Sequence, residues 1–149
     1  MGTRSFIAIK TNTDYKGVYC HLDGYLEHNG RILHEHYDSE FDAALLIYGG
    51  EISSLGKTIG EATDFDNPVS DQCVFYARDR GEKDTGFTAR KNLDELLRYA
   101  ENCGAEFFYL MENNQWTYAE RGAQYFDMSD GSRFGEFQSL EDALAQGGK

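Results

Sequence analysis

The segment AEFFYLMENNQWTYAER at residues 105–121 constrains the fold most, because it reads as two strands joined by a tight turn. Aromatic and aliphatic side chains fill both halves, and Asn113-Asn114 separates them. Asparagine tolerates the positive φ angles of a two-residue hairpin turn, and aromatic residues favour strands. Two further β-rich runs, at 4–11 and 15–22, predict a second hairpin. A chain with two such hairpins must build at least one sheet.

Helices are expected between and after these hairpins, each opened by a side chain that can cap the first turn. The expected capping residues are Asn29, Ser39, Asn92 and Ser139. The helix over 92–103 is the clearest, because its apolar residues recur on one face and Gly104 can end it. In the helix that Ser39 opens, the expected apolar surface comprises Ala44, Leu45, Ile47 and Tyr48.

The remaining segments are shorter or less regular. Residues 72–79 alternate as a strand, and another short strand is expected around Asp130-Gly131. Residues 51–71 show no clear period and read as a loop, of a length that is often functional.

These elements together predict the fold class. We expect an α+β protein with a single, mostly antiparallel sheet of about five or six strands and three or four helices packed on one face. The length of 149 residues suits one globular domain over 1–149.

The chain has the features of a cytoplasmic protein. It begins without the apolar segment of a secretory signal, and its apolar runs are far too short to span a membrane. Cys20, Cys73 and Cys103 share no metal-binding spacing, so we expect free thiols in the reducing cytoplasm of a host cell.

The net charge of −12 disfavours direct binding to nucleic acid or to an anionic membrane, both of which need basic patches. Carboxylates crowd residues 32–77, where Lys57 is the only lysine or arginine. Such a surface would attract a protein partner with a basic surface. The candidate contacts are Glu61, Asp64, Asp66 and Asp71. The alternative is that these charges serve solubility alone.

All four histidines lie within residues 21–36, which raises the hypothesis of a metal-dependent enzyme. Spacing argues against it: His34 and His36 point about 200° apart on a helix, so they cannot share an ion. Cys20 and His21 would face opposite sides of a strand. His21 and His28 could still approach each other across a turn, together with Asp23. We favour histidines of a turn and a helix surface, and expect no metal or other cofactor.

A second hypothesis is a small-molecule or nucleotide-binding domain. Its pocket would lie between the corner at residues 21–25 and the loop at 51–71. His21, Asp23 and Tyr25 would be the ligand contacts.

Two motifs resemble a known family. Y-C-H-x-D-G-Y-x-E-x-N-G at 19–30 and G-x-I-S-S-L-G at 50–56 are similar to elements of small acidic proteins encoded by bacteriophages, prophages and plasmids. The resemblance implies that His34 and His36 vary, and it brings no catalytic residues. It implies a fixed framework at the corner of His21, Asp23, Gly24, Tyr25 and Asn29.

The leading hypothesis combines the charge with this resemblance. We expect a non-enzymatic accessory protein of a phage or other mobile element, which binds a host protein through an acidic surface. Inhibition of a host defence or nucleic-acid-handling system would follow from that binding.

Overall fold

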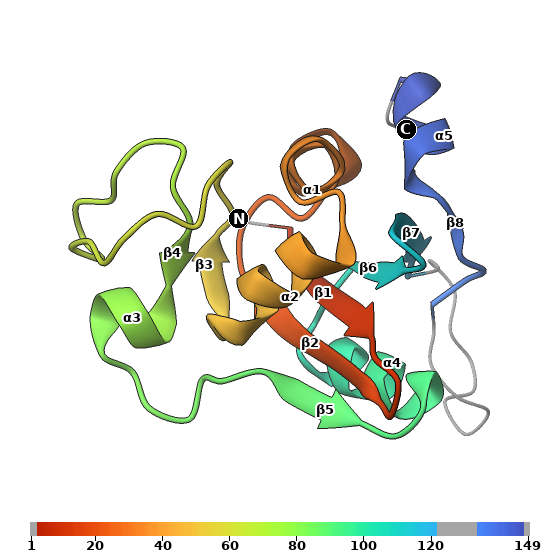
Figure 1. The fold of residues 1–149 in the computed structure, drawn as a ribbon, viewed down its shortest axis with the longest axis horizontal. Coiled ribbons are helices and arrows are strands. Elements are labelled where there is room, and N and C mark those ends of the chain that lie inside the picture. Colours follow the sequence, from red (N-terminus) through yellow and green to blue (C-terminus); the bar gives the residue numbers. More distant parts are fainter. Residues whose placement is uncertain (1–2, 122–133, 148–149) are drawn as a thin grey trace.

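The computed structural model describes residues 3–121 and 134–147, and within them the chain forms one eight-stranded sheet. The strand order is β4-β3-β2-β1-β6-β7-β8, and β5 pairs with β2 (Figure 1). The strands are β1 (Ser5–Lys10), β2 (Tyr15–Cys20), β3 (Ile52–Ser54), β4 (Val74–Phe75), β5 (Thr88–Arg90), β6 (Phe107–Glu112), β7 (Gln115–Glu120) and β8 (Gln138–Ser139).

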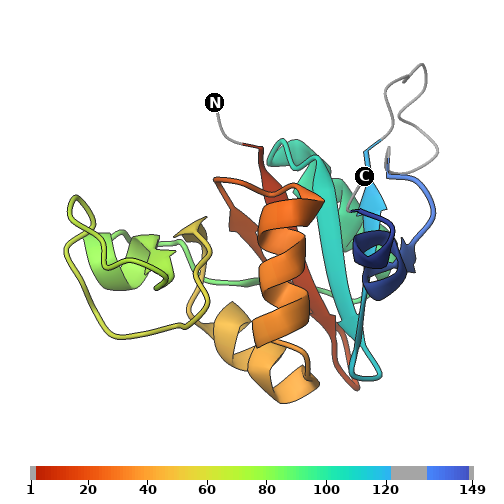
Figure 2. The same cartoon turned by 90° about the horizontal axis from the view of Figure 1, so that it is seen from above.

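Helices cover both faces of this sheet. They are a π-helical turn η1 (Leu26–Gly30), α1 (Arg31–His36), α2 (Glu40–Tyr48), α3 (Tyr76–Arg80), α4 (Leu93–Asn102) and α5 (Leu140–Ala145). Helices α1, α2 and α5 lie on one face and α4 on the other (Figures 1 and 2). In the described part of the chain, no helix combines the length and the apolar character that a bilayer crossing requires.

Strand β1 lies at the centre of the sheet. It pairs antiparallel with β2 and parallel with β6, in register from Ser5 opposite Phe107 to Ile9 opposite Met111. Its residues 5–9 are buried, because helices cover both sides. Alternate side chains therefore enter two separate cores: Ile7 enters the core under α1 and α2, and Phe6 the core under α4.

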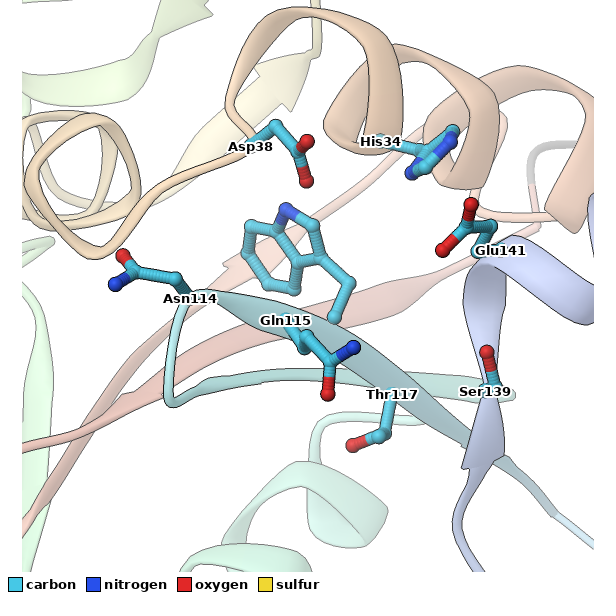
Figure 3. Close-up of a pocket in the computed structure, with 8 residues that line it drawn as sticks. His34, Asp38, Asn114, Gln115, Thr117, Ser139 and Glu141 are labelled. Carbon is cyan, nitrogen blue, oxygen red and sulfur yellow. The ribbon is translucent and has the colours of Figure 1, made fainter.

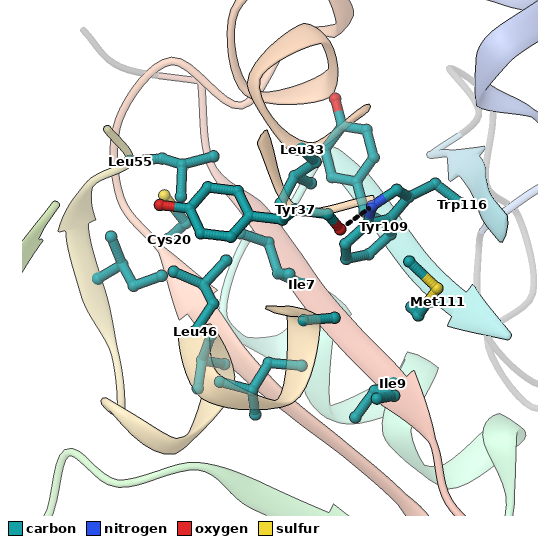
Figure 4. Close-up of a cluster of buried hydrophobic side chains, with 14 of the residues drawn as sticks. Ile7, Ile9, Cys20, Leu33, Tyr37, Leu46, Leu55, Tyr109, Met111 and Trp116 are labelled. Carbon is teal, nitrogen blue, oxygen red and sulfur yellow. Dashed lines mark hydrogen bonds between the residues drawn. The ribbon is translucent and has the colours of Figure 1, made fainter. Parts of the chain in front are cut away.

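Two buried hydrogen bonds link separate segments inside the first core, and Figure 4 shows the one between Trp116 and Tyr37. The indole N–H of Trp116 donates to the carbonyl oxygen of Tyr37 at 2.8 Å, which ties β7 to the end of α1. The hydroxyl of Tyr109, on β6, donates to the carbonyl oxygen of Gly24 at 2.6 Å. Both aromatic residues thus combine apolar burial with a satisfied polar group.

The strongest sequence predictions are confirmed. Both hairpins form, and Asn113 and Asn114 adopt φ angles of 56° and 59° at the turn. Asn92 accepts a hydrogen bond from the amide of Glu95 at the start of α4. Ser39 and Ser139 cap α2 and α5 in the same way. The α+β class and the mostly antiparallel sheet are therefore correct.

Other expectations are wrong. The described residues contain eight strands and five α-helices, more than predicted, and the helices lie on both faces. Of 72–79, only Val74–Phe75 form a strand, and Tyr76–Arg80 form α3. Asn29 does not cap a helix, because the helical turn begins at Leu26 and Asn29 is buried. The strand expected around Asp130-Gly131 lies outside the described residues.

Gly17, in β2, permits the close packing of the two central strands. A Cβ atom there would lie 2.9 Å from the carbonyl oxygen of Ile7 and would overlap the ring of Phe6. We expect Gly17→Ala to lower the free energy of unfolding by about 1–3 kcal/mol, because overpacking forces neighbours out of place. Urea denaturation measures the change.

Gly86→Ala is the matched control, since a Cβ at Gly86 meets no atom within 4 Å. It should change stability by less than about 0.5 kcal/mol. Equal stabilities of the two variants would show that the Gly17 position is not tightly packed.

Candidate functional site

Asn29 organises the corner that follows β2. Its side-chain amide donates to the carbonyl oxygen of Leu22 at 3.1 Å and lies 3.3 Å from Cys20 Sγ. Its backbone amide donates to the carbonyl oxygen of Asp23 at 3.2 Å. Burial raises the pKa of the Cys20 thiol to about 12, which keeps it neutral and unreactive. The buried part of the motif thus holds the chain turn in place.

The three ligand candidates of the corner do not share one cavity. His21 Nδ1 lies 2.7 Å from the hydroxyl of Tyr19, a residue that packs against the core under α4. Asp23 adopts a φ of 57° and borders a hollow on the other side. Tyr25 is exposed, with its ring centre 6.1 Å from that of His28.

The hollow beside Asp23 lies between the corner and the loop at 51–71, where the second hypothesis expected a pocket. Its volume is about 250 Å³. The lining residues include Asp23, His28 and Ile32 from the corner, and Lys57, Val69 and Asp71 from the loop. One lysine, two carboxylates and an imidazole make the lining polar and of mixed charge.

A second hollow, of about 280 Å³, lies between α1, β7 and the start of α5 (Figure 3). His34, Asp38 and Glu141 border it, together with polar side chains of β7. Despite this gathering, in residues 3–121 and 134–147 no three His, Cys, Asp or Glu side chains are placed to hold a metal ion.

The acidic loop, residues 55–72, projects from the edge of the sheet between β3 and β4 (Figures 1 and 2). All four carboxylates predicted to bind a partner are exposed on it: Glu61, Asp64, Asp66 and Asp71. None of them pairs with a basic side chain of the described residues. Hydrogen bonds from Asn67 and from the amide of Asp66 hold the pKa of Asp64 below its ordinary value.

A partly buried ion pair fixes this loop to α3. The carboxylate of Asp79, whose side chain is fully buried, accepts from the guanidinium of Arg78 at 2.8 Å. It also accepts from the amides of Thr63 and Phe75, both at 2.9 Å. Arg78 in turn donates to the carbonyl oxygen of Ile59 at 2.9 Å. The acidic loop is therefore held from within the protein.

Sequence reasoning missed this clamp, because residues 72–79 were read as one strand. It also misjudged α2, whose buried residues are Ala43, Leu46 and Ile47. Leu45 and Tyr48, expected in the apolar surface of the helix, point to solvent with Phe41. A helix that is buried on one side only normally has a polar face on the other side. Helix α2 has apolar residues on both sides, and this pattern in the sequence could have indicated that some of them are exposed.

The fold and surface define an α+β protein with a mixed sheet, a fixed acidic loop and an exposed apolar helix face. No protein-family model, curated protein or solved structure matches the chain. The resemblance to proteins of phages and plasmids therefore stays a prediction.

The clamp gives a stability prediction. Burial disfavours the charge of Asp79, but hydrogen bonds from Arg78, Phe75 and Thr63 outweigh it and lower its pKa. We expect Asp79→Ala to cost about 2 kcal/mol, since hydrogen bonds to charged groups each contribute about 1.5–3 kcal/mol. Amide hydrogen exchange should rise first at Thr63 and across the acidic loop.

The stabilisation by the Asp79 carboxylate decreases as the pH falls. Since the folded-state pKa lies below the unfolded value of about 3.9, the stabilisation is complete above that pH and is lost as the pH falls through the folded value. The difference in the free energy of unfolding between the wild type and Asp79→Ala should therefore become smaller at acidic pH. Asp66→Ala, which removes one exposed carboxylate of the same loop, is the control and should leave exchange at Thr63 unchanged.

Proposed function

We propose that this protein is a non-enzymatic accessory protein of a phage or other mobile element, which acts by binding a host protein through its acidic loop. The observation that carries the proposal is the arrangement of that loop. Its four carboxylates are exposed and lack a basic partner in the described residues, and a partly buried ion pair fixes the backbone of the loop at Ile59 and Thr63.

A fixed loop is suited to binding, because ordering a mobile segment on association costs free energy. Lysine and arginine side chains of the partner would supply the missing counter-charges. Charge complementarity of this kind speeds association and fixes orientation, and salt weakens it. The net charge of −12 would extend the attraction beyond the loop itself.

The chemistry of the partner follows from the sign of the charge. Proteins that handle nucleic acid carry basic grooves for phosphate, and an acidic loop is complementary to such a groove. The same charge repels nucleic acid from the accessory protein. Blocking the groove would inhibit a host defence or nucleic-acid-handling system without any catalytic step.

Neutralising the acidic loop tests this proposal. The variant Glu61→Gln, Asp64→Asn, Asp66→Asn, Asp71→Asn removes four charges, and asparagine suits the φ of 65° at Asp71. We expect it to lose at least tenfold in affinity for a partner captured from host lysate by the wild type. Binding of the wild type should weaken in the same way as salt is raised.

The matched control removes four exposed carboxylates elsewhere: Glu95→Gln, Glu106→Gln, Glu120→Gln, Glu136→Gln. Its net charge equals that of the loop variant. If the acidic loop itself is the binding surface, the control variant should retain binding. Equal losses in both variants would mean that net charge alone drives association. A partner that neither variant nor salt releases would contradict the proposal.

A small-molecule site is the second candidate, and the hollow beside Asp23 favours it. Its volume of about 250 Å³ falls below the roughly 300–1,000 Å³ of most ligand pockets. A small polar compound would therefore fit better than a whole nucleotide. The mixed charges suit a zwitterion, with Lys57 facing an anionic group and Asp23 or Asp71 a cationic one.

Thermal denaturation in the presence of amino acids and nucleoside monophosphates tests this candidate. A ligand at 100 times its Kd stabilises the folded state by about 2.7 kcal/mol. We expect Lys57→Gln to abolish the shift and Lys83→Gln, an exposed lysine that does not line the hollow, to preserve it. No shift with any compound, or a shift that survives Lys57→Gln, would reject the site.

A further inference from the structure

Helix α2 carries apolar side chains on two opposite faces. Ala43, Leu46 and Ile47 are buried in the core. The outward side chains are Phe41, Leu45 and Tyr48, which are 72%, 47% and 61% exposed. Their spacing of i, i+4 and i+7 aligns them along one side of the helix. They form a continuous apolar ridge, here called the α2 ridge.

The α2 ridge continues beyond the helix. The ring of Phe87, next to β5, lies 5.3 Å from the ring of Tyr48 and is 36% exposed. Single exposed apolar residues are common on protein surfaces, whereas contiguous apolar patches mark interaction sites. The α2 ridge and Phe87 together place four large apolar side chains next to one another, and they form such a contiguous patch.

The charges on α2 and on the residues that flank it in the chain are all negative. Asp38, Glu40 and Asp42 lie at the N-terminal end of α2, and Glu51 follows its C-terminal end. Residues 32–56 contain no lysine or arginine, and none of these four carboxylates forms an ion pair within the described residues.

Two basic groups beside this surface, Lys16 and Lys10, are already engaged. Lys16 lies 6.0 Å from the ring centre of Phe87 and pairs with Asp14 at 3.2 Å. Lys10 pairs with Glu112 at 3.2 Å. The carboxylates at the two ends of α2 thus remain unpaired within the described residues, and they supply the negative border of the α2 ridge.

This charge decides between two kinds of occupant. A second copy of the chain, related by a twofold axis, would place the same acidic border against itself. Like charges in such an interface disfavour it. An amphipathic helix with apolar residues on one face and lysine or arginine beside them satisfies both the α2 ridge and its border.

We propose that the α2 ridge binds a cationic amphipathic helix of a partner protein. Phe41, Leu45 and Tyr48 pack against its apolar face, and Asp38, Glu40 and Asp42 meet its basic side chains. The i, i+4 row is the kind of ridge that fits into the groove of another helix. The inference shares with the proposed function that the chain binds a protein, but it uses a surface apart from the acidic loop.

A synthetic peptide of leucine and lysine, arranged on a helical period over about 18 residues, is a direct probe. Titration into labelled protein should shift the amide resonances of residues 38–51 and of Phe87, and leave those of 61–71 in place. A leucine-glutamate peptide of the same pattern should bind at least tenfold more weakly. The leucine-lysine peptide in scrambled order should also bind at least tenfold more weakly.

Variants locate the contact. Phe41→Ser, Leu45→Ser, Tyr48→Ser together should weaken peptide binding at least tenfold, while circular dichroism stays unchanged because these side chains point outward. Val69→Ser replaces an equally exposed apolar residue of the acidic loop and should bind as the wild type does. The set Asp38→Asn, Glu40→Gln, Asp42→Asn should weaken binding and reduce its salt dependence.

Other outcomes overturn the inference. Equal binding of the glutamate peptide would refute the role of charge, and shifts confined to 61–71 would assign the peptide to the acidic loop. A dimer of the wild type that the triple serine variant dissociates would assign the α2 ridge to a second copy. The four-carboxylate loop variant separates the two proposals, because it should bind the peptide normally even if its own host partner is lost.

Discussion

The pairing of β1 with β6 is the contact on which the rest of the structure depends. It joins strands separated by about a hundred residues, and closing so long a loop costs conformational entropy. Burial on both faces offsets that cost, because β1 supplies Ile7 to one core and Phe6 to the other. Helices α1 and α2 cover one face of β1, and α4 covers the other. The corner and the acidic loop then extend from the β2–β3 side of this centre.

The sequence predicted the parts whose signals are local. The β6–β7 hairpin with its Asn-Asn turn, and the helices with Asn or Ser caps, are each specified by residues only a few positions apart in the chain. Strands β3, β5 and β8, of two or three residues, have no such signal, because they exist only through their pairing partners. The parallel contact of β1 with β6 is equally invisible in the sequence, since nothing nearby in the chain specifies it.

In the candidate surfaces, too, local features could be predicted from the sequence and contacts between distant segments could not. The charge of the acidic loop could be predicted from composition, but its attachment through Arg78 and Asp79 could not, because the three segments that meet there are distant or irregular. The outward face of α2 depends on how the helix lies over β1. At the corner, Asn29 was expected to begin a helix, whereas its buried amide holds the preceding turn.

The clamp at Asp79 has an evolutionary consequence. Arg78 and Asp79 hold the loop by main-chain atoms of Ile59 and Thr63. Within it, Asp64 accepts hydrogen bonds from Asn67 and from the amide of Asp66, whereas the exposed carboxylates of Glu61 and Asp66 form no ion pair within the described residues. Substitutions at Glu61 or Asp66 therefore leave the scaffold intact. The loop sequence could therefore change rapidly in evolution without loss of the fold, and a protein engineer could graft a binding sequence at the same place.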